Sequence, residues 1–147
     1  MTGPVARALI DELNTELAAM YPEEGANHFR LDPDEVGPGR GAFLVATDYL
    51  TGLPLGCGAV RSIEPGVAEV KRMYVRPAAR GRKVSRGLLG ALEERARALG
   101  ARRLVLETGT RHAAAIGLYR SAGFSDIEPY GEYVGSPLSL CLAKSLA

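Results

Sequence analysis

The sequence predicts an α/β (α+β) fold, a mixed and mostly antiparallel sheet of about six strands with three to four helices on its faces. Two observations lead to this prediction. Apolar residues recur at helical spacing in three segments, and short apolar segments bounded by turn residues stand between and after them. The resulting order is helix, three strands, helix, strand, helix and two strands. The chain has 147 residues, enough to bury about two thirds of its unfolded surface, so we expect a single domain over residues 1–147.

The first half of the chain predicts one helix and three strands. Apolar residues follow helical spacing over residues 5–20, and Pro22 ends the pattern. Residues 21–41 are rich in Pro, Gly and acidic residues, which predicts a long ordered loop with a short helix around residues 32–36. Loops of this length are often functional. Three antiparallel strands are then expected over residues 42–47, 55–61 and 68–75.

The second half predicts two helices and three strands. Residues 85–100 place a row of leucines and alanines on one helix face, and Gly100 ends the helix. Residues 113–122 form the next expected helix, which Gly123 closes in a Schellman-type ending with Phe124 packing back. The remaining segments, residues 103–108, 124–127 and 138–144, are expected to be strands.

Composition limits the classes of function. The net charge of +1 argues against a broad nucleic-acid surface. No apolar run of about 18 residues and no leader-like pattern occurs, so we expect a cytoplasmic protein with no membrane partner. Cys57 and Cys141 stand far apart in apolar segments and are expected to be buried thiols. His28 and His112 are too isolated to form a metal site.

The most informative segment is the basic turn before the second helix. Five basic residues fall between Arg76 and Arg86. At a helix start the first backbone N–H groups lack intrahelical acceptors and the dipole is positive, so this end binds anions such as a diphosphate. A cluster this tight suits one small polyanion, and a merely solvated surface is the alternative. The residues expected to form the cradle are Arg80, Gly81, Arg82, Lys83, Val84, Ser85 and Arg86.

Two segments resemble motifs of the GNAT superfamily of N-acetyltransferases. Arg80 fits the first position of motif A, which is Arg or Gln, two residues, Gly, one residue, then Gly or Ala. Residues 115–124 resemble motif B, which is Ala, Ile, any residue, Leu, Tyr, three residues, Gly and Phe. The resemblance implies a GNAT fold. Such domains usually begin with a strand before the first helix, and only four residues precede Val5 here, so we expect that strand to be missing and the open sheet edge to offer a homodimer contact.

The same resemblance implies acetyl-CoA as the cofactor and assigns catalytic roles. Counting back from Arg80 to the strand position where many of these enzymes carry a catalytic glutamate gives Glu69, the expected base, with Glu107 in reserve. Strand alternation places Glu69 on one face with Lys71 and Met73. Tyr119 is the expected general acid, because a phenol is protonated at neutral pH. Cofactor contacts are also expected from Met73, Tyr74, Val75, His112 and Tyr119.

The basic turn departs from motif A at both glycine positions, which Lys83 and Ser85 occupy. Glycine there permits positive φ, so Lys83 must adopt an ordinary conformation or carry strain. Ser85 can cap the helix and donate to a phosphate oxygen. We therefore expect acetyl-CoA binding to be retained.

The resemblance further implies that the acetyl acceptor is a primary amine, which attacks the thioester directly in a ternary complex. The amine belongs to a small molecule or a peptide, and the sequence does not choose between them. A module that binds acyl-CoA without turnover is the alternative function, and nucleic-acid binding through residues 76–86 is a third reading. The residues expected to contact the acceptor are Glu24, His28, Phe29, Glu107, Tyr130 and Tyr133.

Overall fold

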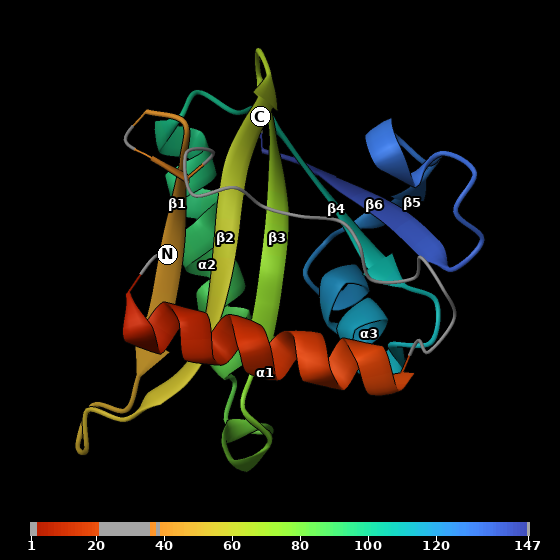
Figure 1. Ribbon diagram of the computed structural model, residues 1–147. Helices are drawn as coiled ribbons and strands as arrows, with labels where there is room; N and C mark the ends of the chain where they lie inside the picture. The colour runs from red at the N-terminus through yellow and green to blue at the C-terminus, as the bar shows by residue number, and fades with distance from the viewer. Residues whose placement is uncertain (1–2, 21–35, 38, 147) are drawn as a thin grey trace.

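The computed structural model describes residues 3–20, 36–37 and 39–146. Within these residues the helices are α1 (Pro4–Met20), α2 (Val84–Ala98) and α3 (Ala113–Ser121), with 3-10 turns η2 (Pro77–Ala79) and η3 (Gly131–Tyr133) (Figure 1). None of the described helices is long and apolar enough to span a membrane. The strands are β1 (Gly41–Thr47), β2 (Pro54–Glu64), β3 (Val67–Val75), β4 (Arg103–Gly109), β5 (Ser125–Ile127) and β6 (Ser139–Ser145).

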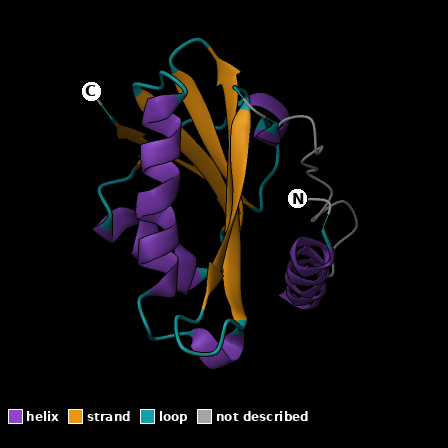
Figure 2. Cartoon of the chain, turned by 90° about the vertical axis from the view of Figure 1, so that its left-hand side faces the viewer, coloured by secondary structure: helices purple, strands orange, loops and turns teal. Residues whose placement is uncertain are grey.

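The six strands form one sheet in the order β1-β2-β3-β4-β6-β5. Only β3 and β4 run parallel, and the other neighbours are antiparallel. A parallel pair needs a crossover connection, which α2 supplies. Figure 2 shows α1 on one side of the sheet and α2 on the other. The predicted fold class is therefore confirmed, and the element boundaries differ from the predicted ones by a few residues at most.

Several expectations concern the ends and edges of the sheet. No strand precedes α1 within residues 3–20, and β1 pairs with β2 alone among the described strands. The expected loop over residues 21–41 and its short helix lie mostly in residues 21–35, outside the described part of the chain. The homodimer contact and the single-domain organisation stay predictions.

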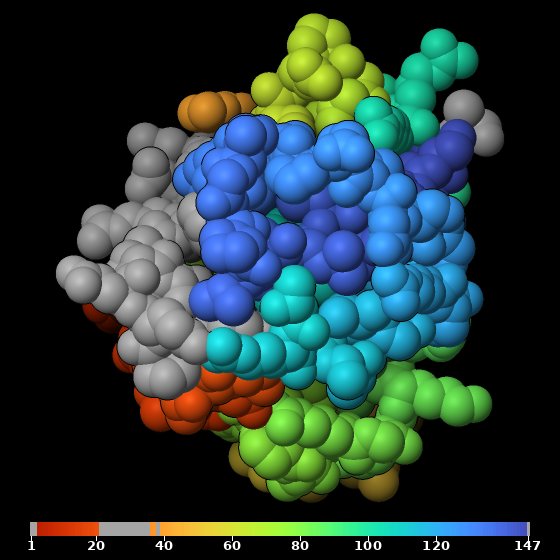
Figure 3. Space-filling model, turned by 90° about the vertical axis from the view of Figure 1, so that its right-hand side faces the viewer, coloured from red at the N-terminus to blue at the C-terminus, as the bar shows by residue number. Residues whose placement is uncertain are grey.

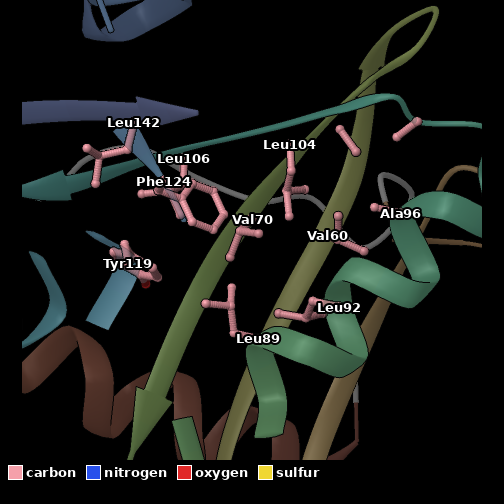
Figure 4. Close-up of a cluster of buried hydrophobic side chains, with 12 residues drawn as sticks. Val60, Val70, Leu89, Leu92, Ala96, Leu104, Leu106, Tyr119, Phe124 and Leu142 are labelled. Atoms are coloured by element: carbon pink, nitrogen blue, oxygen red, sulfur yellow. The ribbon is translucent and has the colours of Figure 1, made fainter. Parts of the chain in front are cut away.

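The main core lies between the sheet and the helices α2 and α3. Leu89 and Leu92 point from α2 onto Val70 and Leu104 of the sheet (Figure 4). Each of these four side chains is buried, and full burial of one such side chain stabilises the fold by about 1.5–3 kcal/mol. A smaller cluster on the opposite face packs α1 on the sheet and contains Leu9, Leu13, Cys57 and Tyr74.

The end of α3 confirms the predicted Schellman motif. The Phe124 N–H donates to the Tyr119 carbonyl at 3.0 Å, and the Gly123 N–H donates to the Arg120 carbonyl at 3.1 Å. Gly123 has φ 101°, a conformation that favours glycine. Phe124 consequently packs back with its ring centroid 5.8 Å from that of Tyr119, in an edge arrangement. This ending fixes the position of Tyr119.

A β-bulge interrupts β3 and changes which side chains share a face. Cys57 and Ala59 of β2 face Tyr74 and Lys71, so two steps on β2 match three on β3. The extra residue, Arg72, has φ 58°. The expectation that Met73 shares a face with Glu69 is wrong, because the bulge turns Met73 to the α2 face, where its side chain packs against the main core.

Gly56 allows β2 and β3 to approach closely, and we expect Gly56→Ala to destabilise the fold. An added Cβ would lie 2.4 Å from the Tyr74 carbonyl oxygen, a backbone atom that cannot rotate away. Overpacking of this kind costs about 1–3 kcal/mol. Gly90→Ala is the matched control, because the added Cβ meets nothing within 4 Å and alanine favours a helix by about 0.5–1 kcal/mol. Urea unfolding of both variants measures the difference, and equal midpoints would contradict the close approach.

Candidate active site

A cleft opens where the two parallel strands separate. The pairing of β3 with β4 covers only Val67 to Val70 against Arg103 to Leu106. Beyond this point β3 stays bonded to β2 and β4 stays bonded to β6, so the two halves of the sheet diverge (Figure 1). The opening holds a cavity of about 380 Å³. Of the residues expected at the site, those that line it are Met73, Tyr74, Val75, Arg80, Gly81, Lys83, Val84, Ser85, Glu107, His112, Tyr119 and Tyr133.

The basic turn and the start of α2 form one end of the cavity. Gly81 has φ 81° and Lys83 has φ 64°, so both take the left-handed conformation. Lys83 stands where motif A has a glycine. The sequence allowed either an ordinary backbone conformation or strain at this position, and the structure shows the strained conformation. Lys83 is also the N-cap residue, so the expectation that Ser85 caps the helix is wrong. Val84 and Ser85 belong to the first turn, whose N–H groups have no intrahelical acceptors.

Arg80 links this end of the cavity to α1. Its guanidinium forms an ion pair with Glu16 of α1, and its Nε donates to the Val75 carbonyl at 3.0 Å. The guanidinium carbon also lies 6.0 Å from the centroid of the Tyr74 ring. Arg80 and Glu16 both line the cavity. A positive charge is therefore held beside the free N–H groups of α2.

Two of the basic residues expected in the cradle do not line the cavity. Arg82 donates to Asp48 in the turn after β1 at 3.0 Å. The backbone N–H of Thr51 and then Arg82 lower the pKa of Asp48 to about 2. Arg86 donates to the Ser121 hydroxyl at the end of α3 at 2.7 Å. These two arginines therefore tie neighbouring elements to the turn.

Glu69 lies outside the cavity lining, in a buried polar cluster. Only 1% of Glu69 is exposed, and its Oε1 accepts from Arg61 Nε at 2.8 Å. Its Oε2 accepts from the Tyr130 hydroxyl at 2.6 Å. Burial, with the Glu69 charge second, raises the pKa of Tyr130 and of Tyr133. Glu69 thus ties the start of η3 to β3. Figure 3 shows the face of the molecule where the C-terminal segments, in blue, gather.

Glu107 differs from Glu69 because it does line the cavity. It extends from β4 beyond the last pairing with β3, and its Oε2 accepts from the Ser139 hydroxyl at 2.5 Å. Burial raises the pKa of Glu107, and this outweighs the lowering by the Ser139 hydrogen bond and by the charge of Lys71. A carboxyl group with a raised pKa is suited to accept a proton near neutral pH.

Tyr119 and His112 border the cavity from α3. Tyr119 is 6% exposed, and burial raises its pKa, so the hydroxyl is protonated at neutral pH. His112 is the N-cap residue of α3, and burial lowers its pKa, which favours the neutral imidazole. The motif B tyrosine thus stands in the same cavity as Glu107.

Sequence reasoning missed two cations in the lining, Lys71 and Arg72. Lys71 is 9% exposed, and its Nζ lies 3.5 Å from Glu132 of η3. Burial lowers the pKa of Lys71. Arg72, the bulged residue, donates to the Asn14 side chain of α1 at 2.9 Å. A lysine on a buried sheet face breaks the usual apolar pattern, which is the one signal that would have found it.

Four of the residues expected to contact the acceptor are not found among the described residues that line the cavity. Tyr130 does not line the cavity. Its hydroxyl donates to Glu69, and its ring packs edge-on against that of Tyr133, which does line the cavity. Glu24, His28 and Phe29 fall within residues 21–35, which lie outside the described part of the chain. Their role stays a prediction.

A mixed sheet that opens between its parallel strands beside a helix N-terminus, with the motif B tyrosine in the opening, defines the GNAT class of transferases. The model of the acetyltransferase (GNAT) family matches residues 6–124. The chain belongs to this family.

The similarity to known proteins extends over nearly the whole chain. The Azospirillum brasilense protein named IAA acetyltransferase is 45% identical over 139 residues, which are 94% of this chain and 88% of that protein. A Klebsiella pneumoniae crystal structure, provisionally assigned as an acyl-CoA N-acyltransferase, is 32% identical with a TM-score of 0.85, covering 99% of this chain and 92% of that one. An Elizabethkingia anophelis GNAT acetyltransferase with acetyl-CoA bound shares the fold at 15% identity, with a TM-score of 0.68 over 99% and 93% of the two chains.

Proposed function

We propose that this protein is an N-acetyltransferase that moves the acetyl group of acetyl-CoA to a primary amine of a small molecule or peptide, by direct attack in a ternary complex. One observation carries the proposal. A single cavity joins the N-terminus of α2, with Arg80 and Lys83 beside it, to a half-buried carboxyl group and a buried tyrosine. The Elizabethkingia neighbour, which holds acetyl-CoA, and the acetyltransferase relatives support this choice of acyl donor.

The residues at the α2 end fit a diphosphate. The N–H groups of Val84 and Ser85 and the charges of Lys83 and Arg80 offer donors to a doubly anionic group. Gly81 leaves the turn open, because a Cβ there would meet nothing within 4 Å. Where β3 no longer pairs with β4, the edge of residues 73–75 that faces away from β2, apart from the Val75 carbonyl bonded to Arg80, can receive an extended pantetheine arm. Acetyl-CoA, when bound, supplies the thioester carbonyl that the amine attacks.

The catalytic roles in the proposal follow from the cavity lining. Glu107 accepts the proton that the ammonium must lose before its lone pair can attack. A carbon–nitrogen bond then forms, the carbon–sulfur bond breaks, and the Tyr119 hydroxyl gives a proton to the leaving thiolate. The second proton that the nitrogen loses passes through water and restores the Tyr119 hydroxyl. Glu69 is less suited to the base role, because Arg61 and Tyr130 already occupy its carboxylate outside the lining. We therefore propose Glu107 as the base and keep Tyr119 as the acid.

The alternative function, an acyl-CoA-binding module without turnover, draws its support from the strained Lys83. Strain of this kind costs about 1–3 kcal/mol and would weaken a phosphate cradle if nothing replaced the lost glycine. The ammonium of Lys83 offers such a replacement. The presence of both Glu107 and Tyr119 in one cavity favours the enzyme.

Calorimetric titration of acetyl-CoA tests the first step of the proposal. Wild type is expected to bind saturably, and Lys83→Ala to bind about tenfold more weakly, because it loses a charge-assisted contact but keeps the left-handed backbone. Lys83→Gly loses the same charge but relieves the strain, so it should unfold at a higher urea concentration than Lys83→Ala. Arg82→Ala is the control, since Arg82 lies outside the lining. No binding at millimolar acetyl-CoA, or an equal loss in the Arg82 control, would contradict the cradle.

A further inference from the structure

We propose that the acceptor carries a carboxylate beside its amine, as an amino acid does, and that Lys71 binds this carboxylate while Glu107 receives the amine. The inference rests on the proposed function and narrows its substrate class. It makes Lys71 a specificity-determining residue.

The strand register places Lys71 and Glu107 on the two strands that border the opening, one on each strand. Val70 pairs with Leu106 in the last rung between β3 and β4, so Lys71 and Glu107 are the first residues beyond it on each strand. Both line the cavity. Val70 and Leu106 belong to the core on the α2 and α3 face, so alternation directs Lys71 and Glu107 to the other face. Adjacent strands lie roughly 5 Å apart, the scale of a small zwitterion.

Charged groups of both signs surround this part of the opening. Lys71, Arg72 and Glu107 line the cavity, and Glu132 lies 3.5 Å from the Lys71 ammonium. Behind them, Arg61 and Glu69 form an ion pair at 2.8 Å. A zwitterion suits such a site, because its ammonium and its carboxylate can each meet an opposite charge.

Glu132, which pairs with Lys71, is a partner that the carboxylate of a ligand can replace. Glu132 lies 3.5 Å from the Lys71 ammonium, longer than the 2.7–2.9 Å typical of a charge-assisted hydrogen bond. The Glu132 side chain is 46% exposed, so it returns readily to water. A lysine that served only to tie η3 to the sheet would need no place in the cavity lining.

Matched acceptors test the proposal. Standard L-amino acids and their carboxamides are compared at fixed acetyl-CoA, with released thiol and the mass of the acetylated product as readouts. Wild type is expected to acetylate at least one amino acid with a kcat/KM more than about tenfold above that of its amide. Lys71→Met should lower kcat/KM for the acid by about 10- to 100-fold and leave the amide within about threefold. Glu132→Gln should keep the preference for the acid.

Other outcomes overturn the inference. If wild type uses amino acids and their carboxamides with equal kcat/KM, the enzyme has no carboxylate site. If Lys71→Met lowers kcat/KM equally for the acid and the amide, the role of Lys71 is structural. The same conclusion follows if Glu132→Gln loses the preference for the acid. Acetylation of spermidine but of no amino acid would overturn the inference and leave the proposed function standing. If no amine is acetylated although acetyl-CoA binds, the proposed function fails and this inference fails with it. Acetyl-CoA titration of Lys71→Met shows whether the variant is folded.

Discussion

Replacing Glu107 with glutamine is expected to lower kcat at pH 7 by about 100- to 10,000-fold, the usual contribution of a general base. Glutamine keeps the size of the side chain and an oxygen that can accept from Ser139, so the cavity shape should persist. What it cannot do is take a proton. Steady-state assays with the best amine give kcat, and acetyl-CoA titration should give an affinity close to wild type.

The pH profile provides a second check of the same role. Burial raises the pKa of Glu107, and the active form is the carboxylate. Activity of wild type should therefore fall as pH decreases through this raised pKa and level off above it. In Glu107→Gln that acid limb should vanish. A nearly unchanged rate in this variant, combined with a severe loss in Glu69→Gln, would return the base role to Glu69.

The second large effect is expected when Glu69 is removed, and it concerns the stability of the fold. Glu69→Ala should lower the free energy of unfolding by about 3–5 kcal/mol, the cost of breaking a buried ion pair by removing one partner. Arg61, whose side chain is only 18% exposed, would keep its charge beside an empty space, and the Tyr130 hydroxyl would lose its acceptor. Urea unfolding measures the loss.

Glu69→Gln is the matched control for this prediction. It keeps an oxygen for Tyr130 and removes only the charge, so we expect a smaller loss, about 1–3 kcal/mol. Its folded fraction should retain a kcat within a few-fold of wild type. If Glu69→Ala were as stable as wild type, the Glu69 cluster would not be what holds η3 in place.

Local patterns predicted most of the fold. The helices α2 and α3 follow from apolar periodicity and from the glycines after them, Gly100 and Gly123, each of which adopts a positive φ. Strand lengths follow from composition and turn residues. The strand order could not be obtained in this way, because the parallel pairing of β3 with β4 joins residues more than thirty positions apart and depends on how α2 crosses the sheet.

The candidate site was predictable where it depends on local sequence. Tyr119 and the basic turn sit at positions that a motif and a helix start determine. The separation of Glu69 from Glu107 was not predictable, because both lie on the same face and only the distant partners Arg61 and Tyr130 distinguish them. The bulge was invisible too, since arginine has no preference for the left-handed conformation that Arg72 adopts.

The bulge also determines which changes of chain length β3 can accept. Upstream of Arg72 the strand presents Lys71 to the cleft face, and downstream it presents Met73 to the core. Deleting Arg72 would make Lys71 and Met73 neighbours on opposite faces, which is simple alternation, so the residues after the bulge would keep their present faces. Deleting Lys71 or Met73 instead would remove a side chain that lines the cavity or packs against the core. We therefore expect β3 to tolerate the loss of Arg72 better than the loss of either neighbour.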